Sequence, residues 1–174
     1  QSKVVYVSGE ESLEQVLERA RRLEIGNERL SVVQENQLSA ILTHLEKEKP
    51  ALVAIDSIQS VYESGGRGFT GSPAQIREST RYFLEFAKKF NATVILTGHV
   101  TKDGQIAGPK LLEHAVDAVL YFDAESSGYR FVRASKNRFG STGEIAVFEM
   151  TPRGLQEVPR ERSLLALHEI GGIG

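Results

Sequence analysis

Hydrophobic and polar positions follow two different periods along the first hundred residues. The stretch KVVYVS (residues 3–8) is rich in β-branched residues and predicts a strand. In the next stretch, apolar residues recur at helical spacing between Leu13 and Ala20. Ser12 and Gln15 stand in front of them at the spacing of a capping box, in which each side chain satisfies the other residue's backbone N–H. The chain therefore opens with a predicted strand, turn and helix.

The same alternation of strand and helix continues to residue 99. The later predicted strands are residues 28–34, 51–55 (ALVAI) and 92–99 (ATVILTGH). A helix with its apolar face at Leu38, Ile41, Leu42 and Leu45 lies between the first two. A second helix begins at Ser72, Pro73 and Gln75 and buries Ile76, Phe83, Leu84, Ala87 and Phe90.

Three strand-like runs follow one another in the last third of the chain, after a loop at residues 100–110. They are residues 116–123, 129–138 and 144–150. Alternating strands and helices followed by consecutive strands predict an α/β fold. We expect a sheet that is mostly parallel, is flanked by helices and has an antiparallel edge.

Composition narrows the class of protein. The 174 residues are 40% hydrophobic and 25% charged, as in one soluble domain with a sizeable core. The net charge of -2 provides no general basic field, so contacts to nucleic acid require local patches or an assembly. The chain has no cysteine, which excludes disulfides and thiolate chemistry and fits a reducing cytoplasm. It starts with Gln and enters a strand at once, so we expect a piece of a longer protein.

Polar residues follow three of the predicted parallel strands. Glu10 and Glu11 follow the first, Asp56 ends ALVAI, and His99 follows LTG. Carboxyl ends of parallel strands share one edge of a sheet, where ligands bind. Two acids and a polar switch there are the layout of a nucleotide hydrolase. Each residue also has a simpler explanation: Glu10 and Glu11 complement a helix N-terminus, Asp56 stabilises a turn, and His99 is a hydrogen-bonded loop residue.

Longer motifs make the pattern specific. They are YVSGEES, ALVAIDSIQSVY, TGHVTKDGQIAGPKLLEH, VDAVLYF and KNRFGSTGEIAVFEM. In this order they resemble the ATPase core of the bacterial RadA/Sms DNA-repair family, a RecA-like group that assembles into hexameric rings. KNRFG is the signature of that family. The match covers roughly residues 3–157, so we expect residues 1–157 to form the core and residues 158–174 to be a tail or linker.

The resemblance implies a role for each strand-tip residue. Asp56 is the Walker B acid, which holds Mg²⁺ through water, and Glu10 polarises the water that attacks ATP. Glu11 is its neighbour and helper. His99 lies where RecA-like proteins couple the nucleotide state to DNA-binding loops. The implied cofactors of the complete protein are ATP and Mg²⁺.

The KNRFG signature adds two cations. Val132, Ala134, Lys136 and Arg138 share one face of a predicted strand, so an apolar face ends in positive charge. Such cations are poorly placed to pair inside their own core. The resemblance implies that Lys136 and Arg138 reach the phosphates of a neighbouring subunit as a finger that stabilises transition-state charge. The alternative is a solvated strand end.

Two loops indicate contact with DNA. Residues 63–71 are rich in glycine and carry Arg67 and Phe69, and the loop after LTGH carries Lys102 and Lys110. In RecA-like proteins the corresponding loops line the central channel. Cations neutralise phosphates and an aromatic ring stacks on bases, as in a track for single-stranded DNA. The resemblance implies DNA-dependent ATP hydrolysis, branch migration during recombination, and as partners branched DNA, further copies of the chain and a RecA-type recombinase.

Parts of the family's pattern are missing. The family has a GxxxxGK(S/T) phosphate loop upstream of the first strand, and these residues contain no such loop. Its four-cysteine zinc element and its Lon-protease-like domain are missing too. We therefore expect this piece alone to be inactive. Two alternatives stay open, namely a non-catalytic RecA-like module for DNA binding or assembly and a KaiC-like regulatory ATPase, although KNRFG argues against the latter. The four histidines lack metal-ligand spacing.

Overall fold

A computed structural model describes residues 2–26, 28–66, 68–99, 112–124, 128–159 and 162–163. The chain divides into two compact units. The first comprises Gln1–Arg21 and Ile25–Val116, and the second comprises Arg22–Glu24 and Asp117–Gly174.

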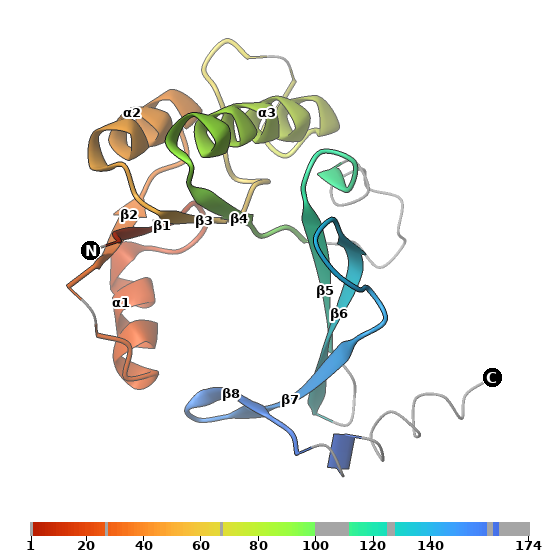
Figure 1. The fold of residues 1–174 in the computed structure, drawn as a ribbon. Coiled ribbons are helices and arrows are strands. Elements are labelled where there is room, and N and C mark those ends of the chain that lie inside the picture. Colours follow the sequence, from red (N-terminus) through yellow and green to blue (C-terminus); the bar gives the residue numbers. More distant parts are fainter. Residues whose placement is uncertain are drawn as a thin grey trace. The chain divides into compact units, whose positions relative to one another are not determined.

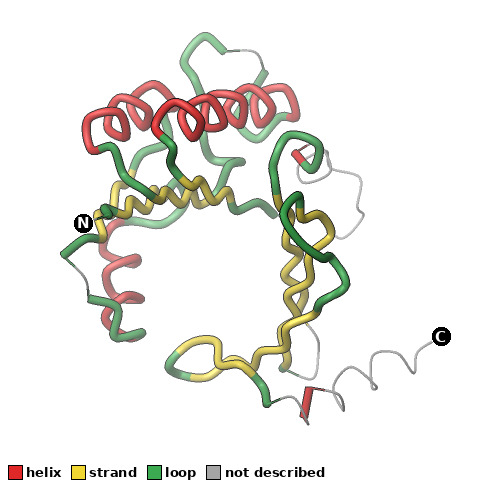
Figure 2. The backbone as a smooth tube through the Cα atoms, in the orientation of Figure 1, coloured by secondary structure: helices red, strands yellow, loops and turns green. Residues whose placement is uncertain are grey.

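The first unit contains a parallel sheet with the strand order β2-β1-β3-β4 (Figure 1). Its strands are β1 (Val4–Ser8), β2 (Leu30–Gln34), β3 (Leu52–Asp56) and β4 (Thr93–Leu96). Its helices are α1 (Leu13–Arg22), α2 (Leu38–Glu48) and α3 (Pro73–Phe90). Figure 2 shows α2 and α3 on one face of the sheet and α1 on the other. The chain crosses the sheet in one direction through α1 and in the opposite direction through α2 and α3, so right-handed crossovers put these helices on opposite faces.

Two helix starts that the sequence predicted are confirmed. The Ser12 N–H donates to Gln15 Oε1 at 2.9 Å, and the Gln15 N–H donates to Ser12 Oγ at 3.3 Å. Ser72 caps α3 and accepts a hydrogen bond from the Gln75 N–H. The side chain of Gln75 bonds to the Gly71 N–H at 3.1 Å, which extends the cap into the preceding loop. Local capping therefore decides where both helices begin.

The core of the first unit lies between the sheet and the helices α2 and α3. It contains Val5, Val7, Val53 and Ile55 from the strands, together with Leu38, Ile41, Leu45, Ile76, Phe83 and Phe86 from the helices. Because side chains alternate along a strand, the opposite face of β1 and β3 carries Tyr6, Ser8, Ala54 and Asp56. The apolar packing of one face thus determines which polar groups share the other.

The second unit contains an antiparallel sheet with the order β5-β6-β7-β8. Its strands are β5 (Ala118–Ala124), β6 (Tyr129–Asn137), β7 (Ile145–Thr151) and β8 (Gly154–Glu157). Strand β8 was not predicted. It forms a tight hairpin with β7, in which Gly154 has a φ of +96°, a value that favours glycine. The predicted α/β fold is confirmed, and the antiparallel strands form a sheet of their own.

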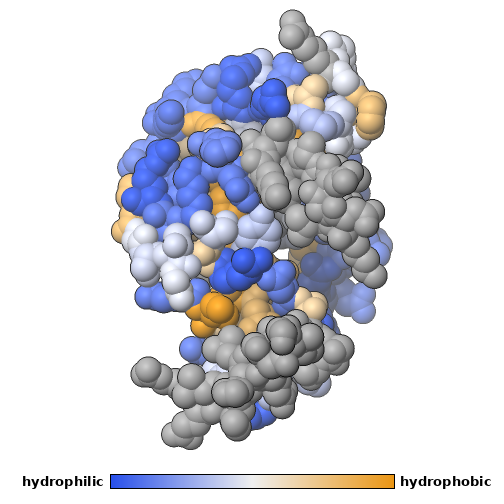
Figure 3. Space-filling model, turned by 90° about the vertical axis from the view of Figure 1, so that its right-hand side faces the viewer, coloured by the Kyte–Doolittle hydropathy of each residue, from blue (hydrophilic) through white to orange (hydrophobic). Residues whose placement is uncertain are grey.

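On the face shown in Figure 3, hydrophilic residues predominate among the described residues and hydrophobic residues form small separate patches. Within the described ranges, every helix is too short or too polar to cross a bilayer.

Candidate functional site

The carboxyl ends of β1 and β3 are joined through their backbones. Ser8 and Asp56 are register partners, and the Gly9 N–H donates to the Asp56 carbonyl oxygen at 2.7 Å. Glycine suits this position, because a Cβ on Gly9 would lie 2.8 Å from Ser60 Cβ and closer still to Ser60 Oγ. The strand tips that carry Glu10 and Asp56 are therefore held in contact.

Two hydroxyl groups hold the carboxylate of Asp56. Asp56 Oδ2 accepts a hydrogen bond from the Tyr6 hydroxyl. Thr97 Oγ1 lies 2.7 Å from Asp56 Oδ1 and 3.3 Å from the Ile55 carbonyl oxygen, so the closer carboxylate is its main acceptor. Burial raises the pKa of Tyr6, and the hydrogen bond to Asp56 raises it further. The phenol therefore stays protonated and keeps donating at neutral pH.

Glu10 lies between a hydroxyl and an imidazole. The Ser57 hydroxyl donates to Glu10 Oε1, and His99 Nε2 lies 3.5 Å from Glu10 Oε2. The Glu10 side chain is 46% exposed, which leaves it accessible to water. The structure thus brings together Glu10 and His99, which the sequence placed on two different strand tips.

The segment that follows Asp56 contacts both neighbouring strand tips. Ser57 reaches Glu10 after β1, while the Ile58 N–H donates to the Thr97 carbonyl oxygen at 3.0 Å after β4. The Gln59 side-chain amide donates to the His99 carbonyl oxygen at 3.2 Å. Three successive residues, 57–59, therefore contact the chain that follows β1 and the chain that follows β4.

Glu11 points to a different partner. Its carboxylate forms an ion pair with Arg19 of α1. Its backbone N–H donates a hydrogen bond to Ser8 Oγ at 3.2 Å, and Ser8 Oγ in turn donates to the Glu11 carbonyl oxygen. These contacts connect Glu11 to the start of α1, while Glu10 faces Ser57 and His99. The two neighbouring carboxylates therefore have different partners, and the role of Glu11 as a helper of Glu10 stays a prediction.

The site residues fit a magnesium ion bound through water. Within the described ranges, no cluster of three or more His, Asp or Glu side chains could hold a metal ion directly. Mg²⁺ commonly keeps several waters and takes one or two carboxylates. Each oxygen of Asp56 accepts one hydrogen bond from a hydroxyl group and retains a lone pair for a metal-bound water. The 174 residues contain no GxxxxGK(S/T) pattern, so a phosphate loop of that type is not among them.

The two cations of KNRFG lie in different environments. Lys136 is half-buried near the end of β6. Arg138 lies in the turn after β6, with Nη1 2.6 Å from Asp117 Oδ1, and its N–H donates to the Asp117 carbonyl oxygen. Both side chains are more than half exposed, so this ion pair lies at the surface and not in a core, and the role of Arg138 as a finger stays a prediction. Asp117 adjoins the Arg138 turn because β5 pairs with β6.

The predicted DNA-binding loops are described in part. Phe69 is 78% exposed, as a ring that stacks on a base must be. Arg67, Lys102 and Lys110 lie outside the described residues. Their proposed contacts with DNA stay predictions.

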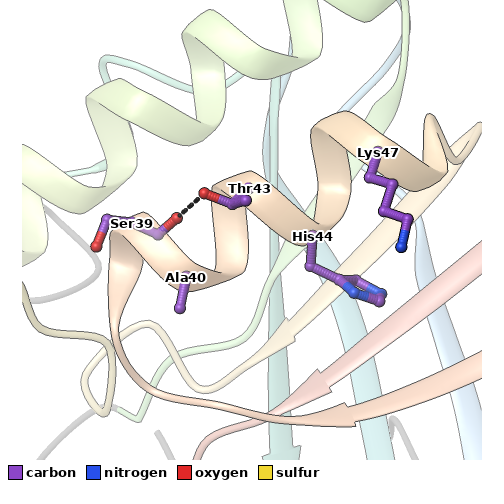
Figure 4. Close-up of a pocket in the computed structure, with 5 residues that line it drawn as sticks. All are labelled: Ser39, Ala40, Thr43, His44 and Lys47. Carbon is purple, nitrogen blue, oxygen red and sulfur yellow. Dashed lines mark hydrogen bonds between the residues drawn. The ribbon is translucent and has the colours of Figure 1, made fainter.

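A groove on α2 is unrelated to the acids. It is open, has a volume of about 490 Å³, and is lined by Ser39, Ala40, Thr43, His44 and Lys47. Figure 4 shows all five side chains along one helix, with Thr43 bonded to the Ser39 carbonyl oxygen. The groove contains no strand-tip residue, so the candidate site is the edge formed by the ends of β1, β3 and β4.

Sequence reasoning missed three hydroxyl-bearing residues of this site, namely Tyr6, Ser57 and Thr97. A weak signal exists for Tyr6, which alternates with Val5 and Val7 and so faces away from the core. Ser57 and Thr97 directly adjoin strand ends, but their partners are known only from the pairing of β1, β3 and β4.

Comparison with known proteins assigns the chain to a family. Residues 1–105, more than half of the chain, match the model of an AAA domain family. The chain belongs to this AAA domain family. The chain is 53% identical to the DNA repair protein RadA of Aquifex aeolicus over 158 residues, which are 90% of this chain and 36% of that protein. It is 44% identical to the DNA repair protein RadA of Escherichia coli (strain K12) over 159 residues, 91% of this chain and 35% of that protein.

These matches confirm the resemblance to the RadA family. The chain spans about a third of the length of these curated relatives. Its fold is similar to that in the crystal structure of the RadB recombinase, with a TM-score of 0.61, 24% identity, and coverage of 90% of this chain and 79% of that chain. The RecA-like fold predicted from the sequence is therefore confirmed.

Proposed function

We propose that this chain is the larger part of the ATP-hydrolysing core of a DNA repair ATPase. The observation that carries the proposal is the pair of strand tips joined by the hydrogen bond from the Gly9 N–H to the Asp56 carbonyl oxygen, at which hydroxyl groups hold both Asp56 and Glu10. A metal acid and an exposed water-polarising acid on adjoining strand tips are what phosphoryl transfer to water requires. The similarity to proteins named DNA repair protein RadA supports the biological context.

In the proposed mechanism, Glu10 accepts a hydrogen bond from the attacking water and increases its nucleophilicity. Ser57 and His99 orient the Glu10 carboxylate toward that water. Asp56 orients a metal-bound water, and Mg²⁺, when bound, neutralises charge that develops on the transferred phosphoryl group. His99 connects this site to the residues that follow β4, so a change in its position alters the hold on Glu10.

The finer features belong to the same proposal. The exposed Phe69, together with Arg67, Lys102 and Lys110, forms a track for single-stranded DNA in a ring of subunits, and ATP hydrolysis drives branch migration in the cytoplasm. Lys136 and Arg138 act on the neighbouring subunit's nucleotide. Because Arg138 pairs with Asp117 here, it must leave this partner to act as a finger.

A second candidate is a non-catalytic module for DNA binding or ring assembly. It is favoured by the missing GxxxxGK(S/T) pattern, without which the chain has no phosphate cradle of its own. The two candidates predict different results when that loop is supplied, because only the catalytic core should then bind and hydrolyse ATP.

The deciding experiment uses an extended protein, defined as this chain together with an upstream phosphate loop. In the extended protein, Glu10→Gln should lower the rate of ATP hydrolysis by about 10² or more, because it removes the charge that polarises water. ATP affinity should stay nearly unchanged, since Glu10 contacts no phosphate in this mechanism. Turnover is measured by phosphate release and affinity by calorimetry.

Glu14→Gln is the matched control, because Glu14 is a nearby exposed acid in the first turn of α1 with no role in the proposed mechanism. It should retain most of the turnover. Equal rates for Glu10→Gln and the unaltered extended protein would sink the catalytic assignment. Failure of the extended protein to bind ATP at all would favour the non-catalytic module.

A further inference from the structure

We propose that Tyr6 and Thr97 are positioning residues that clamp Asp56 so that it acts on the metal through water. The inference rests on the proposed function, in which Asp56 is the metal acid. It adds a specific task for two hydroxyl groups on the strands that flank β3.

The geometry of the clamp involves three strands. Tyr6 belongs to β1, and Thr97 directly follows β4, while Asp56 ends the strand between them. One hydroxyl bonds to each carboxylate oxygen. Rotation of the carboxylate about its last bond would break both hydrogen bonds together, so the clamp selects one orientation.

The clamp also limits how Asp56 binds a metal. Each of its oxygens has one lone pair engaged by a neutral donor and one that remains. A metal-bound water can donate to a remaining lone pair while both hydroxyls stay bonded, and Mg²⁺ gives up its waters reluctantly. The arrangement therefore suits contact through water.

The phenol of Tyr6 is specific for this task. Its register partner on β3 is Ala54, whose small side chain leaves space for the ring to reach Asp56 two residues further along. A phenylalanine at position 6 would fill the same space without the hydroxyl. The hydroxyl is therefore the part of Tyr6 that matters for Asp56, and it can be removed with little change in packing.

Two isosteric changes test the clamp in the extended protein. Tyr6→Phe and Thr97→Val each remove one hydrogen bond to a charged acceptor, which corresponds to about a 10- to 100-fold effect. We expect kcat to decrease by about 10- to 100-fold and the Mg²⁺ concentration that gives half-maximal activity, the Mg²⁺ midpoint, to rise. The KM for ATP should change by less than about 2-fold. Thr97→Ser keeps the hydroxyl and should restore both values. Tyr62→Phe, a tyrosine in the loop after β3, should behave as the unaltered protein.

Binding of Mn²⁺ in the presence of a non-hydrolysable ATP analogue, followed by electron paramagnetic resonance, provides a readout independent of turnover. Tyr6→Phe and Thr97→Val should weaken it, and Thr97→Ser should not. A purely structural role for the hydroxyls predicts lower stability with unchanged kcat, Mg²⁺ midpoint and Mn²⁺ affinity. That result would overturn the clamp. If Tyr6→Phe fails to fold, the comparison of Thr97→Val with Thr97→Ser tests the clamp by itself.

Asp56→Asn separates this inference from the proposed function. If it abolishes turnover while the hydroxyl variants match the unaltered protein, the clamp is wrong and the role of Asp56 stands. If Asp56→Asn hydrolyses ATP normally, the proposed function fails and the clamp fails with it.

Discussion

Replacing Gly9 by alanine should disrupt the joint between the two strand tips that carry the acids. The added Cβ would lie 2.8 Å from Ser60 Cβ and closer to Ser60 Oγ. Because Ser60 Cβ is attached to the backbone, rotation of the side chain does not relieve the overlap. The segment must shift, and the hydrogen bond from Ser60 Oγ to the Ser57 carbonyl oxygen, 2.7 Å long, is then lost.

The size of the effect follows from these two contributions. Overpacking of one methyl group costs about 1–3 kcal/mol, and the lost hydrogen bond costs about 1 kcal/mol. The expected loss of stability is therefore about 2–4 kcal/mol. It corresponds to about 30- to 700-fold faster amide hydrogen exchange wherever exchange requires opening of the sheet.

Amide hydrogen exchange of β1 and β3 measures this loss in the 174-residue chain, and it reports on the first unit separately from the second. Gly9→Ala combined with Ser60→Gly should recover most of the stability, since Asp56 O, at 3.6 Å, is then an ordinary neighbour of the new methyl group. Gly26→Ala is the control, because no heavy atom of the described structure lies within 4 Å of its added Cβ.

The reasoning would be refuted by unchanged exchange in Gly9→Ala. It would also be refuted if Ser60→Gly gave no rescue, with a coupling free energy below about 0.5 kcal/mol in the double-mutant cycle. Either result would mean that the tips of β1 and β3 are not in steric contact at Gly9.

Two further predictions concern the core and the proposed finger. Phe83 is fully buried, so Phe83→Ala should destabilise the first unit by about 3–5 kcal/mol in hydrogen exchange, whereas Phe69→Ala at an exposed position should leave its stability within about 0.5 kcal/mol. If the finger acts between subunits, rings of the extended protein that mix Lys136→Ala/Arg138→Ala subunits with Glu10→Gln subunits should regain part of the turnover. Mixed rings without any recovery would contradict the action between subunits.

The sequence predicted the acidic residues of the candidate site, but it did not predict the residues that bond to them. Asp56 and Glu10 stand at the ends of apolar runs, and this position alone directs them to the ligand-binding edge of a parallel sheet. Tyr6 and Thr97 reach Asp56 across separations of 50 and 41 residues. Such contacts depend on strand order and register, which periodicity does not encode.

The sequence by itself determined the strands and helices, the two capped helix starts and the location of the acids, because each depends on neighbours within a few residues. It did not reveal β8, whose hairpin depends on pairing with β7, or the ion pair of Arg138 with Asp117. Tertiary structure alone decided which hydroxyls hold Asp56 and Glu10. The physical reason is that a carboxylate accepts a hydrogen bond from whichever donor lies within reach, and the packing of three strands determines that distance.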